Sequence, residues 1–328
     1  MKKILAILIS TMLIITFTFP VYANYDDATQ IDGWTLAIKR FTANQQGKTP
    51  VETATSILKE LGMNDSFINL LSVEKKMEIY NATFIKKSTE YAKITSEGIQ
   101  IPLSEEKYLQ ELIVTKNTST SNIQPFAQGD SWAVPDDGKD SLLVKEMIIF
   151  ETKNAPKGTF GIILGFSFKN FVIRYRGEDI ISLSGEYLIF NRNSFAITEQ
   201  YVYTQTTSSG TTAHTQTNYY GPNDLEDPND LLQSNNGISY QFNLPNNIYT
   251  LQSSLLYTDA TFLITVSSLI AFPNSKTSFN VYGNYFHRKI ELFIDPTISI
   301  NGANVSVSPK LLYDQHQIRT EEPITYTP

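Results

Sequence analysis

From Leu142 onward the chain is a succession of short segments rich in Ile, Val, Phe, Tyr and Thr, separated by turn-forming residues. Because no helical pattern interrupts them, they predict antiparallel sheets rather than a parallel α/β fold. Two such sheets most commonly hide their apolar faces as a sandwich, so we predict a β-sandwich-like domain over residues 141–328. The expected strands are Leu142–Glu151, Thr159–Phe168, Phe171–Arg176, Ile180–Ser184, Glu186–Phe190, Ala196–Gln205, Ile238–Leu244, Tyr249–Tyr257, Thr261–Phe272, Ser278–Phe286, Lys289–Ile294 and Asn304–Val307.

The preceding part, residues 24–114, has mainly helical patterns, which makes the expected fold class α+β. Thr49 can cap a helix whose first residue is Pro50, and Glu52 stands at the capping-box position. Gly62 suits the end of that helix. Asn64 can start a second, short helix. Loosely helical spacing covers Ile31–Phe41, and Ser104–Val114 fits either a capped helix or a strand, with the helix as the better interpretation.

A longer helix is expected after Ser72, because apolar residues recur at helical spacing and would form one stripe. Such a stripe could line a groove, but a core face is the better interpretation. Its members are Val73, Met77, Tyr80, Phe84 and Tyr91. Residues 115–140, rich in Ser, Thr and Asn at their start, offer no apolar periodicity and predict a linker.

The first 23 residues have the pattern of a secretory signal peptide. Lys2 and Lys3 precede an apolar run, and small residues at Val21 and Ala23 suit cleavage after Ala23. An uncleaved anchor is disfavoured, because Pro20 stands where a spanning helix would have to continue. We therefore expect a secreted, extracellular protein without stable membrane insertion.

Charge and cysteine content exclude several kinds of partner and chemistry. The chain has 33 acidic and 26 basic residues, a net charge of −7 that becomes −9 when Lys2 and Lys3 are removed. Nucleic acid is therefore not an expected partner, since it requires a basic face. The chain has no cysteine. A lipoprotein anchor, disulfides, a thiolate zinc site and a cysteine nucleophile are thus impossible.

Candidate metal ligands are few. The three histidines, His214, His287 and His316, are scattered, so a zinc site would need distant loops to converge. His287, at an expected strand end, is better interpreted as a structural hydrogen-bonding residue. Two acidic loops, Asp130–Asp140 and Asn223–Asp230, could bind calcium, but their spacing is not that of an EF-hand and solvated turns are the better interpretation.

Candidate catalytic residues are limited to acids, because no nucleophile-elbow motif is present. A glycosidase needs two facing carboxylates, and the central β region supplies Glu178, Asp179, Glu186 and Glu199. Glu178 and Asp179 are expected in a turn. No residue is assigned a catalytic or cofactor-binding role, and no cofactor is expected apart from the calcium alternative.

The stretch Thr204–Thr212 resembles in composition the Ser/Thr-rich insertion hairpins of β-barrel pore-forming toxins. A membrane hairpin would need apolar side chains at alternate positions, and Gln205–Asn218 has almost none. We expect a polar surface hairpin or loop.

Together these features resemble secreted proteins of Gram-positive bacteria that join a short helical segment to a β domain. The first functional hypothesis is a non-catalytic binding protein whose partner is an extracellular protein or carbohydrate. The alternative is a hydrolase that cleaves a polysaccharide or cell-wall substrate with paired carboxylates. A cleft with convergent ionisable groups would favour the hydrolase, and a shallow apolar and aromatic patch would favour the binding protein.

Overall fold

The computed structural model describes residues 30–31, 34–35, 47–95, 99–118, 140–152, 155–170, 178–224, 230–245, 248–249, 253–288, 296–301, 304–310 and 313–328. The chain divides into two compact units, residues 1–37 and 38–328. In the first unit, strands β1 (Gln30–Ile31) and β2 (Trp34–Thr35) form an antiparallel pair. The helix expected over Ile31–Phe41 is thus wrong at these residues, and its other positions lie outside the described part, as does the expected signal peptide.

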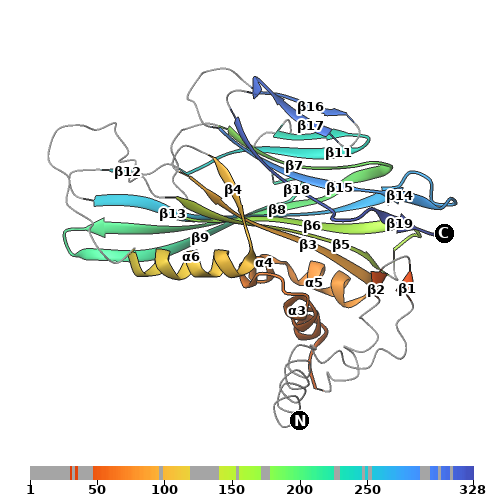
Figure 1. Ribbon diagram of the computed structural model, residues 1–328, viewed down its shortest axis with the longest axis horizontal. Helices are drawn as coiled ribbons and strands as arrows, with labels where there is room; N and C mark the ends of the chain where they lie inside the picture. Colours follow the sequence, from red (N-terminus) through yellow and green to blue (C-terminus); the bar gives the residue numbers. More distant parts are fainter. Residues whose placement is uncertain are drawn as a thin grey trace, which may run out of the picture. The chain divides into compact units, whose positions relative to one another are not determined.

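The larger unit is built on an eight-stranded antiparallel sheet, shown in Figure 1. Its strand order is β4-β3-β5-β6-β13-β8-β9, and β12 pairs with β13 beside this path. The bounds are β3 (Ala82–Ile94), β4 (Gln100–Leu103), β5 (Ser141–Thr152), β6 (Thr159–Lys169), β8 (Leu188–Thr207), β9 (Gly210–Tyr220), β12 (Ile248–Tyr249) and β13 (Ser253–Ile270).

A second antiparallel sheet has five strands in the order β10-β11-β7-β15-β18. Two small antiparallel pairs complete the described strands of this unit: β16 with β17, which follow each other in the chain, and β14 with β19, which do not. The bounds are β7 (Glu178–Gly185), β10 (Leu231–Ser234), β11 (Gly237–Asn243), β14 (Thr277–Phe279), β15 (Val281–Arg288), β16 (Thr297–Asn301), β17 (Asn304–Ser308), β18 (Tyr313–Arg319) and β19 (Ile324–Tyr326).

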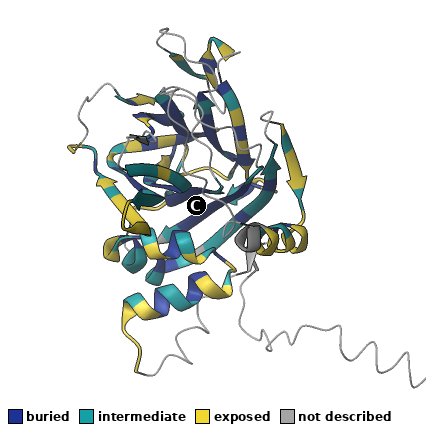
Figure 2. Ribbon diagram, turned by 90° about the vertical axis from the view of Figure 1, so that its left-hand side faces the viewer, coloured by how far each residue is buried: buried dark blue, intermediate teal, exposed yellow. Residues whose placement is uncertain are grey.

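The two large sheets face each other across an aromatic layer. Tyr285 of β15 packs against Phe168 of β6 and Phe262 of β13, with ring centroids 5.1 and 5.3 Å apart. The two sheets are so close here that a Cβ added to Gly283 of β15 would lie 2.4 Å from the side chain of Leu164 on β6. Most of the buried residues in Figure 2 belong to these strands. The fold is therefore β-rich, with several antiparallel sheets and few helices, as the strand pattern predicts.

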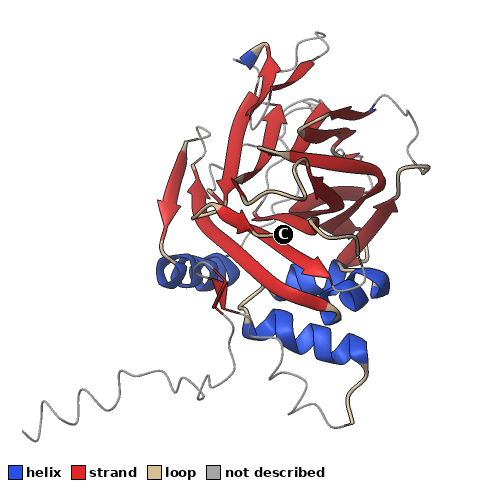
Figure 3. Ribbon diagram, turned by 90° about the vertical axis from the view of Figure 1, so that its right-hand side faces the viewer, coloured by secondary structure: helices blue, strands red, loops and turns tan. Residues whose placement is uncertain are grey.

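Four helices lie along the other face of the eight-stranded sheet (Figures 1 and 3). They are α3 (Pro50–Glu60), α4 (Asp65–Leu70), α5 (Val73–Tyr80) and α6 (Glu105–Thr118). The side chain and backbone of Thr49 exchange hydrogen bonds with Glu52, so the predicted capping box of α3 is present. Asn64 and Ser72 cap α4 and α5. Helix α4 packs tightly on the sheet, where a Cβ on Gly165 would lie 2.6 Å from the Phe67 ring.

The expected long helix after Ser72 is wrong beyond Tyr80. The helix ends at Asn81, whose side-chain amide donates to the Met77 carbonyl at 2.9 Å. Residues 82–94 continue as β3 and pair with β5 along almost their whole length. Within α5 the expected apolar stripe holds only in part: Tyr80 packs against the apolar core, but Val73 is exposed, and Lys75 and Ile79, outside the stripe, are buried.

This pairing corrects the expected domain division. A sheet shared by β3 and β5 joins residues that were assigned to a helical segment (24–114) and to a β domain (141–328). The helices also share one apolar core with β5, β6 and β13. Of the expected linker, residues 115–118 belong to α6, and residues 119–139 lie outside the described part.

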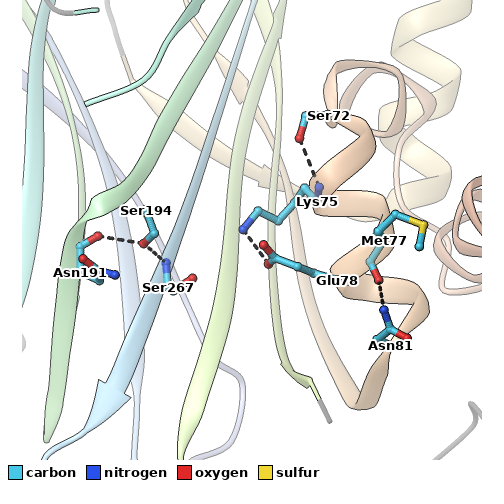
Figure 4. A network of polar contacts seen from close by, with 8 residues as sticks. All are labelled: Ser72, Lys75, Met77, Glu78, Asn81, Asn191, Ser194 and Ser267. Atoms are coloured by element: carbon cyan, nitrogen blue, oxygen red, sulfur yellow. Dashed lines mark hydrogen bonds and ion pairs between the residues drawn. The ribbon is translucent and has the colours of Figure 1, made fainter. Parts of the chain in front are cut away.

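Some expected strands merge. Leu188–Phe190 of one expected strand and Ala196–Gln205 of the next fall in the single strand β8, because residues 192–195 form a bulge opposite Val266, while Glu186 and Tyr187 form the turn before it. Ser194 bridges this bulge: its hydroxyl donates to the Asn191 carbonyl and accepts the Ser267 N–H, both at 2.8 Å (Figure 4). The expected strands 171–176 and 289–294 lie outside the described residues.

Figure 4 also shows two polar contacts of α5, one at its N-terminal end and one within the helix. The Ser72 hydroxyl accepts the Lys75 N–H at 3.2 Å, and the Lys75 ammonium is paired with Glu78 at 2.7 Å. The nearly buried Lys75 therefore keeps a charged partner. Among the described helices, none is long and apolar enough to cross a membrane.

Candidate functional site

The four candidate acids occupy different environments. Glu178 and Asp179 begin β7 rather than forming the expected turn, and Asp179 is buried between the sheets. Glu199, on β8, is also buried, whereas Glu186 is exposed after β7. The turn prediction failed because Glu178–Asp179 pairs with Phe242–Asn243 of β11, which the local sequence does not reveal.

Asp179 accepts hydrogen bonds from three groups of β15. The hydroxyl of Tyr285 donates to its Oδ2, and His287 Nδ1 lies 3.0 Å from the same oxygen. Its other oxygen, Oδ1, accepts the backbone N–H of Arg288 at 3.0 Å. Burial, followed by the charge of Asp179, raises the pKa of Tyr285. Asp179 therefore fixes the end of β15 against β7.

Glu199 extends this polar group along the interior of the two sheets. It accepts a hydrogen bond from the Tyr201 hydroxyl at 3.2 Å, and Tyr201 contacts the Phe262 ring that also stacks on Tyr285. Burial raises the pKa of Glu199 from 4.5 to about 7, although hydrogen bonds from Tyr201 and Asn218 act in the opposite direction. The Glu199 carboxyl thus keeps its proton to a much higher pH than an exposed one.

His316 borders the same interior, stacked on Tyr285 with ring centroids 6.1 Å apart. Its Nδ1 lies 2.7 Å from the side-chain oxygen of Gln100. Burial, with smaller electrostatic contributions from His287 and Lys145, lowers the pKa of His316 from 6.5 to about 3. We call Asp179, Glu199, Tyr201, Tyr285, His287 and His316 the inter-sheet polar cluster.

The inter-sheet polar cluster lacks the access that the hydrolase hypothesis requires. Paired carboxylates in a glycosidase must both reach the same glycosidic bond. Two of the four candidate acids, Asp179 and Glu199, are only 1% and 4% exposed. A polymer chain cannot reach carboxyls that are covered in this way, so the cluster is suited to positioning strands.

The histidines do not converge on a metal. His214 stacks on Tyr203 at the exposed β8–β9 hairpin, far along the chain from the cluster that holds His287 and His316. His287 is a hydrogen-bonding residue near the end of β15, as the sequence predicts. Within the described ranges, no group of three His, Asp or Glu side chains is arranged to hold a metal ion.

The two acidic loops considered for calcium are described only in part. Asp140 pairs with Lys93 at 2.9 Å, while residues 130–139 lie outside the described part. In the second loop, the Asp224 carboxylate accepts the Gly221 N–H at 2.9 Å, as a turn-forming residue would, and residues 225–229 are not described. Calcium binding at these loops stays a prediction.

A group of exposed apolar side chains lies where β8 begins and β13 ends. Ile189 and Leu269 are directly opposite each other in the β8–β13 pair, and they are 46% and 39% exposed. Beside them Tyr187 and Phe272, 46% and 54% exposed, have ring centroids 6.0 Å apart. We call these four residues the aromatic patch. Large apolar groups that gather on a surface are typical of a contact surface for another molecule.

The backbone at the aromatic patch supports a special role for Tyr187. Its φ is 59°, a left-handed conformation that is unfavourable for a bulky residue by about 1–3 kcal/mol. Its carbonyl accepts the Ala271 N–H at 2.7 Å, which holds Tyr187 beside Phe272. All four residues fall in strands that the sequence predicts, yet only the tertiary pairing shows that they share one surface.

Comparisons with known proteins identify no relative. The sequence matches no family model, and no curated protein is similar to it. Solved structures with partial similarity include the collagen-binding subdomain of the Enterococcus faecalis surface protein ACE, with 12% identity, 50% of this chain and 89% of that one covered, and a TM-score of 0.19.

Two toxins of Clostridium perfringens give similar values. Delta-toxin has 9% identity over 55% of this chain and 83% of its own, with a TM-score of 0.18. The membrane-inserted form of NetB has 10% identity, coverages of 56% and 90%, and a TM-score of 0.19. Scores of this size establish no common fold, so function must be argued from the residues themselves.

Proposed function

We propose that this chain is an exported protein that acts outside the cytoplasm by binding another protein, without catalysing a reaction. The observation that carries this proposal is the aromatic patch, a surface of four large apolar side chains centred on a strained tyrosine. In this proposal the two facing sheets form a sandwich-type scaffold, and the inter-sheet polar cluster fixes their packing.

A protein surface is a better partner for the aromatic patch than a carbohydrate. Ile189 and Leu269 add aliphatic area but no hydrogen-bonding groups, whereas sugars present many hydroxyls that need partners. The Tyr187 and Phe272 rings are tilted by 57° to each other and form no flat platform for a sugar ring. Aromatic residues with aliphatic neighbours are instead typical of the central part of protein interfaces.

We expect that replacing either aromatic residue of the patch will weaken binding strongly. Central aromatic residues of interfaces typically contribute about 2 kcal/mol or more, which corresponds to about 30-fold in affinity. A panel of purified cell-surface and extracellular-matrix proteins should be measured by biolayer interferometry against the wild type, Tyr187→Ser and Phe272→Ser. Leu232→Ser, at an exposed position on β10, is the matched control and should bind like the wild type.

Two results would contradict this function. One is equal binding by the wild type and both aromatic variants. The other is turnover of peptidoglycan or another polysaccharide that Asp179→Asn or Glu199→Gln abolishes while circular dichroism shows an intact fold. The second result would favour the hydrolase alternative.

The proposal that the protein is exported can be tested by determining its N-terminal residue. If the first 23 residues are a signal peptide, protein collected from the culture medium should begin at Asn24. Edman sequencing or mass spectrometry of the intact protein measures this directly. Recovery of the chain with Met1 intact in the membrane fraction would show that the segment is retained as an anchor.

A further inference from the structure

Strand β9 forms one edge of the eight-stranded sheet. Among the described strands it pairs with β8 alone, in an unbroken register from Ile197–Tyr220 to Thr207–Gly210. Residues 210–217 are all exposed, so the side chains on both faces of the strand reach solvent. An edge of this kind presents main-chain donors and acceptors that can pair with a further strand.

The hairpin geometry shows which backbone groups point outward. A turn of two residues, Ser208–Ser209, makes Thr207 and Gly210 the first hydrogen-bonded pair, and hydrogen-bonded pairs then alternate along the ladder. The even-numbered residues of β9 therefore bond to β8. The N–H and C=O groups of the odd-numbered residues point away from the sheet; these residues are Thr211, Ala213, Thr215, Thr217 and Tyr219.

The other three terminal strands of the two large sheets, β4, β10 and β18, carry features that discourage pairing, and β9 does not. At the opposite edge, β4 has four residues and contains Pro102. In the smaller sheet, β10 also has four residues, and β18 carries the charged Asp314 and Arg319. Strand β9 has eleven residues and contains no Lys, Arg, Asp, Glu or Pro, and its register has no bulge. Short length, charge, proline and bulges are the usual protections of an edge, so β9 is an unprotected one.

We propose that β9 pairs antiparallel with β9 of a second copy of this chain around a two-fold axis at Thr215, so that the two eight-stranded sheets become continuous. This register places Thr215 opposite the same residue of the partner and uses the whole strand. It pairs Ala213 with Thr217 and Thr211 with Tyr219, so every outward-pointing residue meets another outward-pointing residue. All the free main-chain groups of the strand are thereby satisfied.

The absence of charge on β9 favours a second copy of the same strand as its pairing partner. In a two-fold pairing, a charged residue near the axis faces a like charge from its own copy, which is destabilising. The chain as a whole has a net charge of −7, yet β9 contributes none of it. Threonine residues at 211, 215 and 217 instead give polar, β-branched cross-strand neighbours that favour pairing.

The test is sedimentation velocity of the purified chain from Asn24 to Pro328, without the proposed signal peptide, over a wide concentration range. The wild type is expected to pass from monomer to dimer, and Thr215→Val should do the same because the backbone pairing is kept. Thr215→Pro removes an outward N–H that β8 does not use, and Thr215→Lys places two like charges together at the axis. Both changes should weaken self-association by about tenfold or more.

Ser306→Lys, at an exposed position on β17, controls for added charge and should dimerise like the wild type. Circular dichroism must show that each variant is folded. A wild type that stays monomeric at every concentration would overturn the proposal. So would a Thr215→Pro variant that associates like the wild type, or assemblies larger than a dimer, because the two-fold pairing occupies the whole edge. Dimerisation should persist in Phe272→Ser, which separates this proposal from the binding function.

Discussion

Asp179→Ala is expected to lower the free energy of unfolding by about 3–5 kcal/mol. The carboxylate is 1% exposed and accepts hydrogen bonds from the Tyr285 hydroxyl, His287 Nδ1 and the Arg288 backbone. Alanine would leave these donors buried without their acceptor, and removal of one partner from a buried charged group typically costs this amount. Urea unfolding followed by circular dichroism measures the change.

Two further variants show whether the loss comes from the buried contacts of Asp179. Glu186→Ala removes an exposed carboxylate directly after the same strand and should change the stability by less than about 0.5 kcal/mol. Asp179→Asn keeps one acceptor oxygen and should fall between the alanine variant and the wild type. A loss below about 1 kcal/mol for Asp179→Ala would mean that the inter-sheet polar cluster does not hold β15 against β7.

The second large effect concerns how stability depends on pH at Glu199. Burial raises the pKa of Glu199 from 4.5 to about 7, so the folded state keeps a proton that the unfolded state releases. The stabilisation is fully present below pH 4.5 and is lost as the pH rises through 7. A pKa shift of one unit corresponds to 1.36 kcal/mol. The shift at Glu199 from 4.5 to about 7 therefore lowers the free energy of unfolding by about 3 kcal/mol between these two pH values.

The titration of His316 changes the free energy of unfolding with pH in the opposite direction. Burial lowers its pKa from 6.5 to about 3, so the unfolded state binds a proton that the folded state does not. Its contribution is present above pH 6.5 and is lost as the pH falls towards 3. Between about pH 4.5 and 6.5 the effects of Glu199 and His316 largely cancel. The titration of these two groups should therefore change the wild-type stability little in this range.

Glu199→Gln separates the two effects, because glutamine keeps an acceptor for Tyr201 but cannot release a proton. Relative to the wild type, this variant should gain about 3 kcal/mol as the pH rises from 4.5 to 8. Urea unfolding at half-unit pH intervals measures the difference, with Glu186→Gln as the control for loss of an exposed carboxylate. A difference between Glu199→Gln and wild type that stays constant over this range would show that Glu199 titrates as an ordinary exposed acid.

Local sequence chemistry predicts the features that need only a few neighbouring residues. The Thr49 and Glu52 capping box and the Asn64 and Ser72 caps all follow from interactions within five residues. Strands such as β5 and β6 are also predicted nearly to their ends, because their apolar runs are long and bounded by turn residues.

Features that depend on distant partners could not be predicted. Tyr80, Phe84 and Tyr91 fit helical spacing, but residues from 82 onward pair with a strand that begins at Ser141. The inter-sheet polar cluster likewise joins Asp179 to residues more than 100 positions away. Local propensity cannot show such contacts, since tertiary pairing decides between a helix and a strand. The aromatic patch was missed for the same reason.

The position of β13 has a consequence for the order in which the molecule can assemble. This strand lies between β6 and β8, although it begins 84 positions after β6 ends, at Ser253 against Lys169. In a chain that emerges from its N-terminus, the β5–β6 and β8–β9 hairpins can form early, but each exposes an open edge until residues 253–270 arrive. Long-range pairing of this kind slows folding, and unpaired edges invite aggregation. A factor that shields these edges during emergence would therefore raise the yield of folded protein.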